Sequence, residues 1–318
     1  MYREKTVAVV VPAYNEEVLI RKVIETMPSF VDKILVVNDK STDNTAVVVQ
    51  EYVRRDPDRV ALLDLKVNQG VGGAIAEGYK WARDSEIDCT AVMAGDAQMD
   101  PDDLPKLLDP VVEGRADYTK GNRLFYGDAW HMIPRLRYLG NSGLSLLTKI
   151  ASGYWHVADS QTGYTVASLQ VLKTLDLDRI YKRYGMPNDM LVKLNVYDFR
   201  VKDVHVKPVY NIGETSGIKI RKVFFTIPLL LFRLFMYRMV QKYIIRNTHP
   251  LVFFYLLGGF MLLLDVPLAV RLIFRWTQGA SVTVENAFAV LFCAFMGFQS
   301  ILFAMLFDME ANKDLQGK

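Results

Sequence analysis

Short apolar segments alternate with amphipathic ones through the first 122 residues, and this alternation constrains the fold more than any other feature. The apolar segments are nearly uninterrupted runs of β-forming residues, as in strands that are covered on both faces. They cover residues 6–11, 33–38, 60–64, 89–93 and 117–121. Helical spacing marks residues 16–27, 45–55, 71–83 and 102–112 between them. The alternation predicts an α/β fold with a mostly parallel, Rossmann-like sheet and helices on both faces.

After residue 121 the pattern becomes less regular. Helices are predicted at residues 135–152 and 187–195, and strands at residues 200–206 and 207–210. We expect residues 1–220 to form one domain, because this length suits a single sizeable α/β unit.

Polar side chains gather where the second and fourth predicted strands end. The second strand ends in Asn38 and Asp39, and residues 91–100, AVMAGDAQMD, repeat the pattern. Ligands of open α/β sheets bind at the carboxyl ends of strands, so acceptors at two such ends indicate a nucleotide and a metal. The alternative for the second strand is an ordinary turn into a helix, capped by Thr42 or Asp43.

The end of the first strand adds an aromatic ring and further acceptors. Residues 11–17 read VPAYNEE, in which Tyr14 is suited to hold a nucleobase, although Asn15 has the alternative role of a helix cap. Together with the acidic end of the second strand, this segment resembles the family 2 glycosyltransferases, which are inverting enzymes of the GT-A fold. The resemblance implies a nucleotide pocket lined by Pro12, Ala13, Tyr14, Glu16 and Asp39.

A glycine-rich segment, NQGVGGAIAEG, occupies residues 68–78. Glycines at a loop-to-helix junction let the backbone approach a ligand closely. The segment follows the third strand and its spacing differs from the dinucleotide fingerprint, which argues against a nicotinamide oxidoreductase. The resemblance implies instead that this segment closes the nucleotide site, with Gly70 among the binding residues.

The segment MAGDAQMDP, residues 93–101, is the candidate metal site. Magnesium takes hard oxygen ligands, commonly one or two carboxylates together with substrate phosphates. The family has an Asp-x-Asp at this point; Asp96 matches its second Asp, Gln98 matches a Gln that often follows, and Ala94 replaces its first Asp. The resemblance implies Mg²⁺ or Mn²⁺ on Asp96 and Gln98, and the alternative is a helix cap near Asp100 with Asp96 exposed.

Three later segments resemble the family's phosphate and acceptor motifs. GNRL, residues 121–124, supplies Arg123 for the departing diphosphate, and DSQTGY, residues 159–164, supplies Asp159 as a catalytic residue and Gln161 beside the acceptor. Arg135 is a candidate anchor for an acceptor phosphate, with an exposed charge as the alternative. GETS, residues 213–216, resembles the segment that precedes the membrane anchor in the polyprenyl-phosphate branch, which implies that Lys219 and Arg221 meet a lipid phosphate.

The carboxyl-terminal third is far more apolar than the rest. Residues 250–274 and 286–307 are each long enough to span a bilayer. Residues 222–245 are predicted to form an interfacial helix whose Arg238, Lys242 and Arg246 share one face near anionic head groups. We therefore expect a juxtamembrane helix at residues 221–247, two transmembrane helices within 248–310 and a polar tail at 311–318.

Charge places the catalytic domain on the cytoplasmic side. Basic residues precede the first span and no signal peptide is evident, although Arg271 and Arg275 near its far end weaken the positive-inside argument. The two cysteines, Cys89 and Cys293, lie in a predicted strand and a predicted span, so no disulfide is expected. A net charge of only +3 argues against nucleic acid as a partner.

Taken together, the residues and the resemblance predict transfer of a hexose from a nucleotide diphosphate sugar to a polyprenyl phosphate, such as dolichyl or undecaprenyl phosphate. Two alternatives stay open: a membrane protein that binds a nucleotide sugar without catalysis, motivated by Ala94, and a polysaccharide synthase of the same family. A homo-oligomer is a further expectation, because Gly258, Gly259 and Gly297 suit close helix packing.

Overall fold

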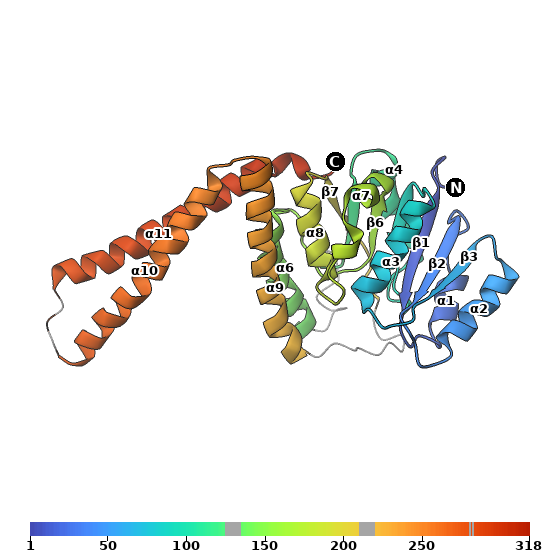
Figure 1. Ribbon diagram of the computed structural model, residues 1–318, viewed down its shortest axis with the longest axis horizontal. Helices are drawn as coiled ribbons and strands as arrows, with labels where there is room; N and C mark the ends of the chain where they lie inside the picture. The colour runs from blue at the N-terminus through green and yellow to red at the C-terminus, as the bar shows by residue number, and fades with distance from the viewer. Residues whose placement is uncertain (125–134, 210–219, 280, 282) are drawn as a thin grey trace. The chain divides into compact units, whose positions relative to one another are not determined.

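The structure is a computed structural model that describes residues 1–124, 135–209, 220–279, 281 and 283–318 (Figure 1). The chain divides into two compact units. The first comprises residues 1–236 and 314–318, and the second comprises residues 237–313.

A seven-stranded sheet forms the centre of the first unit, with the order β3-β2-β1-β4-β6-β5-β7 (Figure 1). The strands are β1 (Val7–Ala13), β2 (Lys33–Asn38), β3 (Val60–Asp64), β4 (Cys89–Val92), β5 (Tyr118–Asn122), β6 (Thr165–Ser168) and β7 (Val201–His205). Only β6 runs antiparallel to its neighbours β4 and β5 within this sheet. The predicted mostly parallel sheet is confirmed. Sequence reasoning missed β6, because four residues give too short a pattern to recognise.

Helices cover both faces of the sheet, as the nearly all-apolar strands predicted. Alternate residues of β1 point to opposite faces. Val7, Val9 and Val11 pack with α1 (Ile20–Glu25), α2 (Thr45–Arg55) and α4 (Leu104–Val112). Ala8 and Val10 pack on the opposite side, where α3 (Val71–Asp84), α7 (Leu169–Thr174) and α8 (Met186–Val196) supply the apolar side chains. Three short helices complete the connections: η1 (Pro101–Asp103), η2 (Leu177–Arg179) and η4 (Lys313–Leu315).

The first helix is much shorter than the predicted segment of residues 16–27. It begins at Ile20, because the backbone before it is held by other partners. Asn15 has a positive φ of 57°, and the amides of Glu16 and Glu17 donate to side chains of the next loop. The predicted strand at residues 207–210 is also wrong, since residues 207–209 have no regular structure and residue 210 lies outside the described part.

Two longer helices belong to the later part of the first unit. They are α6 (Arg135–Ser152) and α9 (Ile220–Val240). Ile227 and Leu231 of α9 are buried against Ala151 of α6. The last residues of α9 belong to the second unit.

The second unit contains two helices that are long and apolar enough to cross a membrane. They are α10 (Leu251–Thr277) and α11 (Val284–Ala311), with mean hydropathies of 2.1 and 2.2 over their most apolar stretches. Glycines let the two helices approach: a Cβ on Gly258 would lie 2.9 Å from the carbonyl oxygen of Gly297. These two glycines therefore serve packing between the two helices of one chain.

The predicted cationic face of the juxtamembrane helix is wrong for two of its three residues. Arg238 has no exposed surface and Lys242 is only 7% exposed. Arg238 donates to both carboxylate oxygens of Asp308, at 2.7 and 2.9 Å, and Lys242 donates to Asn312. The helix also changes to a π-helix, η3 (Gln241–Arg246), which alters the spacing on which the prediction relied. Only Arg246 of the three is exposed.

Candidate active site

The carboxyl ends of β1, β2 and β4 meet at one edge of the sheet. Ala13 is in register with Asn38, and the amide of Gly95, just beyond β4, donates to the carbonyl of Pro12 at 3.1 Å. Pro12 and Ala13 are buried, whereas the ring of Tyr14 is 49% exposed at this edge. The strand register thus places a buried floor beside an accessible aromatic ring.

The polar residues after β2 hold the loop after β1. The amide of Asn15 donates to the hydroxyl of Ser41 at 2.9 Å, and the Asn15 side-chain oxygen accepts from the amide of Thr42 at 2.8 Å. The amide of Glu16 donates to the hydroxyl of Thr45 at 2.8 Å. Much of the VVNDKSTDNT segment therefore orders the neighbouring loop, and Asp43 also accepts from the amide of Thr45 at the start of α2 at 3.0 Å.

Asp39 connects the end of β2 to the glycine-rich segment. Its two carboxylate oxygens accept from the amides of Gln69 and Gly70 at 2.6 and 2.7 Å, and the side chain is only 3% exposed. Gly70 has a φ of +80°, and a Cβ there would lie 2.6 Å from the carbonyl oxygen of Lys182. Glycine is thus required at residue 70 both by conformation and by space. Asp39 and Gly70 therefore lie together, and the carboxylate fixes the loop.

A carboxylate pair lies where β1 and β4 end. Burial, the charge of Asp96 and the charge of Asp43 raise the pKa of Glu16 to about 7. The rise reflects burial first and the two neighbouring carboxylates second, so Glu16 is a partly shielded acid at an edge that carries other negative charge. Gly95 lies close to the end of β1, because an added Cβ would lie 3.3 Å from the Pro12 carbonyl oxygen and 3.4 Å from the Glu16 Cγ.

The segment after β4 forms a tight loop around Asp96. The Asp96 carboxylate accepts from the amide of Gln98 at 3.1 Å, and Ala97 between them has a φ of +55°. The side-chain amide nitrogen of Gln98 is buried and finds no hydrogen-bond partner among the described residues. Asp100 caps η1 by accepting from the amide of Asp102 at 3.1 Å, so its carboxylate has a structural role.

Asp96 and Gln98 fit a divalent cation that takes its remaining ligands from a bound substrate. In the parts of the chain that the structure describes, no group of three or more His, Cys, Asp or Glu side chains is arranged to hold a metal alone. Asp96 offers a hard oxygen at a crowded negative edge, and the buried amide of Gln98 can turn its oxygen outward. Magnesium sites with one or two carboxylates and substrate phosphates match this supply of ligands.

Arg123 and Asp159 form a bidentate ion pair beyond β5. The Arg123 Nε donates to Asp159 Oδ2 at 2.8 Å and its Nη2 donates to Oδ1 at 3.2 Å. Burial by itself would raise the pKa of Asp159, but the charge and hydrogen bonds of Arg123 and the charge of Lys120 lower it below its usual value. The carboxylate has no exposed surface, so its main role here is to orient the Arg123 guanidinium.

Gln161 is fixed by its neighbour Ser160 and by helix α8 of the first unit. Its side-chain nitrogen donates to the Ser160 hydroxyl at 2.6 Å and to the Asn188 oxygen at 3.1 Å. Asn188 lies on α8 and also accepts from the hydroxyl of Thr148 on α6 at 3.0 Å. The DSQTGY segment is therefore bound between these helices.

Sequence reasoning missed two buried charges next to this segment. Burial lowers the pKa of Lys120 to about 8, and its ammonium donates to the carbonyl of Thr162. Burial raises the pKa of Asp203 to about 6, and its carboxylate accepts from Asn122 at 2.6 Å. The available signal was a lysine and an aspartate inside strand segments, which is unusual for a covered sheet.

Three predicted acceptor residues cannot be compared with the rest of the site. Lys219 lies outside the described residues. Arg135 and Arg221 lie within α6 and α9, but their side chains are outside the described part.

Comparison with known proteins places this geometry in a family. The sequence profile described as glycosyl transferase family 2 matches residues 8–176. A UDP-N-acetylglucosamine–dolichyl-phosphate N-acetylglucosaminyltransferase of Methanococcus voltae is 29% identical over 71% of this chain and 96% of its own length. A polyprenol monophosphomannose synthase of Mycolicibacterium smegmatis is 27% identical over 69% of this chain and 84% of its own.

A solved structure shows the same fold at lower sequence identity. It is a glucosyl-3-phosphoglycerate synthase of Mycobacterium tuberculosis, in complex with Mn²⁺, UDP and glucosyl-3-phosphoglycerate. The TM-score is 0.55, with 19% identity, over 74% of this chain and 80% of that one. The profile covers more than half of the present sequence, including the ends of β1, β2 and β4. The chain belongs to glycosyl transferase family 2.

Proposed function

We propose that the chain transfers a hexose from a nucleotide diphosphate sugar to a polyprenyl phosphate, with inversion at the anomeric carbon. The observation that carries the proposal is the edge where β1, β2 and β4 end, with Glu16, Asp39 and Asp96 around it. The names of the two relatives specify dolichyl phosphate and polyprenol monophosphomannose, which supports a polyprenyl phosphate as the acceptor.

The nucleotide is proposed to lie on the buried floor at the end of β1. Pro12 and Ala13 supply this floor, and the exposed ring of Tyr14 is available to stack on the base. Asp39 holds Gly70 at the start of α3, where backbone amides suit a phosphate. Glu16 completes the carboxylate edge that faces the diphosphate.

Asp96 and Gln98 are proposed to hold Mg²⁺ or Mn²⁺ together with the diphosphate. When bound there, a divalent cation supplies positive charge that offsets the charge developing on the leaving diphosphate. The Mn²⁺ in the Mycobacterium tuberculosis structure supports a divalent cation in this fold.

The acceptor itself simplifies the chemistry. A phosphate monoester with a second pKa of about 6 is mostly a dianion at neutral pH, so its oxygen attacks without a strong general base. The protein must orient this nucleophile and stabilise the leaving group. Asp159 holds the Arg123 guanidinium for that task, and Gln161, Arg135, Lys219 and Arg221 are the proposed acceptor contacts.

The domain plan follows from the same proposal. Residues 1–220 carry catalysis, residues 221–247 lie at the membrane surface, and two spans within 248–310 anchor the chain before a polar tail at 311–318. Helices α10 and α11 are of suitable length and hydropathy for the spans. We place the catalytic part on the cytoplasmic side, because exposed arginines such as Arg246 precede the first span.

The test is transfer by the purified full chain, with a panel of nucleotide sugars and a polyprenyl phosphate, read by mass spectrometry of the lipid product. Asp96→Asn is expected to lower kcat/KM by about 10²–10³-fold, the range for losing one preorganised electrostatic contact. Chelation with EDTA should abolish transfer in the unchanged protein, and added Mn²⁺ should restore it.

Asp100→Asn is the matched control, because this carboxylate lies in the same loop but caps η1. It should keep most of the transfer activity. Equal activity of the two variants would refute the role of Asp96.

A second candidate is a membrane protein that binds a nucleotide sugar without transferring it. Ala94 favours it, because the family usually has a carboxylate at that point. Tight binding of a nucleotide sugar with no lipid-linked product, across metals and acceptors, would support this alternative. A polymeric sugar product would instead support a polysaccharide synthase.

A further inference from the structure

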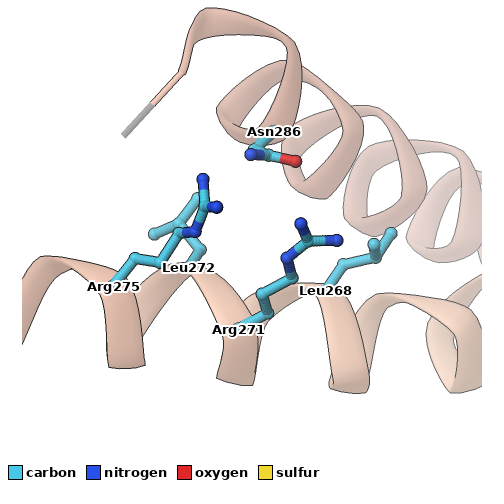
Figure 2. Close-up of a pocket in the computed structure, with 5 residues that line it drawn as sticks. All are labelled: Leu268, Arg271, Leu272, Arg275 and Asn286. Atoms are coloured by element: carbon cyan, nitrogen blue, oxygen red, sulfur yellow. The ribbon is translucent and has the colours of Figure 1, made fainter. Parts of the chain in front are cut away.

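The loop end of the helical pair α10 and α11 carries two arginines that the proposed transfer reaction does not use. Arg271 and Arg275 are four residues apart on α10 and therefore share one face. Both line a crevice whose other wall includes Asn286 of α11, and Leu268 and Leu272 complete the lining. Figure 2 shows both guanidinium groups turned from α10 toward Asn286.

The positive charge in this crevice has no described counter-charge. Neither guanidinium has a hydrogen bond or an ion pair with another residue among those that the structure describes. The side-chain nitrogen of Asn286 donates to the Thr283 hydroxyl at 2.9 Å, within its own helix start. Glu285 lines a different surface, together with Phe288. The crevice therefore presents hydrogen-bond donors and positive charge that suit an anionic ligand.

The position along α10 indicates where that anion comes from. At about 1.5 Å per residue, Arg271 lies about 30 Å along the helix from Leu251, which equals the thickness of a bilayer's hydrocarbon core. Trp276, just beyond, is 72% exposed, and exposed tryptophans favour the interface between lipid and water. If α10 starts at one surface of the bilayer, Arg271 and Arg275 therefore lie at the depth of the phospholipid phosphates at the other surface.

We propose that Arg271, Arg275 and Asn286 bind the phosphate group of a phospholipid in the leaflet that the hairpin loop reaches. The proposal rests on membrane insertion of α10 and α11, which is part of the proposed function, and is independent of the sugar. Arginine is suited to this ligand because its planar fork donates two parallel hydrogen bonds to phosphate oxygens.

The test measures phospholipid retention by the full chain. The purified, delipidated protein is titrated with phosphatidylglycerol in detergent, and bound lipid is counted by native mass spectrometry. Arg271→Gln/Arg275→Gln is expected to weaken retention about tenfold or more, because charge-assisted hydrogen bonds are lost. Asn286→Asp should weaken it as well, because the new carboxylate occupies the guanidinium groups.

Two further ligands identify the source of the phosphate. A glucosyl diacylglycerol, which lacks phosphate, should bind the unchanged protein and the double variant equally weakly. Inorganic phosphate at millimolar concentration should not displace phosphatidylglycerol. Displacement would overturn the assignment to a lipid and identify free phosphate as the ligand.

The charge-matched control is Arg54→Gln/Arg179→Gln, which removes two exposed cations of the first unit, outside the crevice and the apolar helices. It should retain phosphatidylglycerol as the unchanged protein does, and an equal loss in both double variants would overturn the proposal. Sugar transfer is measured in parallel as a folding check. If the unchanged protein retained phosphatidylglycerol but transferred no sugar, only the proposed function would be contradicted. If it transferred sugar but retained no more phosphatidylglycerol than Arg271→Gln/Arg275→Gln, only the crevice proposal would be contradicted.

Discussion

Asp203 is the described carboxylate whose protonation is most open to a direct test of stability. Burial raises its pKa in the folded protein from 3.8 to about 6. Between these values the folded state binds more protons than the unfolded state, so stability is complete below pH 4 and falls as pH rises toward 6. A shift of about two units corresponds to an upper limit of about 3 kcal/mol.

Asp203→Asn should remove this pH dependence. The amide oxygen can still accept from Asn122 and from the amide of Ala158, which bind one carboxylate oxygen at 2.6 and 3.0 Å. Urea unfolding of the full chain in detergent should show that the variant gains about 2–3 kcal/mol relative to the unchanged protein between pH 4 and pH 6.5. Asp58→Asn, at an exposed carboxylate, provides the reference. A difference that stays constant with pH would contradict the prediction.

At the level of single residues, the sequence predicted polarity at strand ends but not burial inside strands. Asp39 and Asp96 were found because an apolar run that stops in a carboxylate is visible without any tertiary information. Lys120 and Asp203 were missed because each depends on neighbours distant in sequence, such as Thr162 and Asn122. The role of Asp39 in holding Gly70 was likewise invisible, since it needs the register of two loops.

Among the elements, α3 lies unusually close to β1 because of one glycine. A Cβ on Gly78 would lie 2.2 Å from Cγ1 of Val10, which is far inside contact distance. Alanine is better than glycine in a helix by about 1 kcal/mol, so propensity alone predicts stabilisation by Gly78→Ala. Overpacking costs about 1–3 kcal/mol. We expect this cost to exceed the gain in helix propensity, because the short side chain of Val10 cannot move away from the added methyl group, so Gly78→Ala should be destabilising.

The free energy of unfolding from urea titration tests this expectation. Gly143→Ala on α6 is the matched control, because a Cβ there has nothing within 4 Å and should stabilise by about 0.5–1 kcal/mol. The double variant Val10→Ala/Gly78→Ala should recover part of the loss, and the coupling measures the clash directly. If Gly78→Ala were as stable as Gly143→Ala, α3 would be able to shift away from β1 at no cost in stability, which would contradict the prediction.

The alternation of elements was predictable because strands covered on both faces must be apolar throughout. The first helix was overestimated for a local reason. Residues 16–19 have helix-compatible side chains, but the amides of Glu16 and Glu17 are bound by Thr45 and Asp43. The buried pair of Arg238 and Asp308 could not be foreseen either, because its partners are separated by 70 residues.

For the whole molecule, the chain leaves the first unit after residue 236 and returns to it at residue 314. The returning segment extends the edge of the sheet: Gln316 forms a parallel bridge with Val201, and the amide of Gly317 donates to the Val201 carbonyl at 3.0 Å. Arg115 closes the contact by donating to the carbonyl of Lys318 at 2.7 Å. The start of β7 is therefore paired on this side by residues that follow both apolar helices.

Gly317→Val tests whether this pairing protects the edge of the sheet. A Cβ at residue 317 would lie 2.8 Å from the Cβ of Ala116 and 3.0 Å from that of Lys202, so valine should displace the segment. Hydrogen exchange followed by mass spectrometry should then show faster exchange in the peptide that covers residues 314–318. The exposed substitution Asp314→Ala, in the same segment, should leave the exchange unchanged. If Gly317→Val left the exchange unaltered, the pairing of residues 316–318 with β7 would not protect the edge of the sheet. Faster exchange confined to this segment, with transfer activity preserved, would show instead that the pairing stabilises the fold without taking part in the reaction.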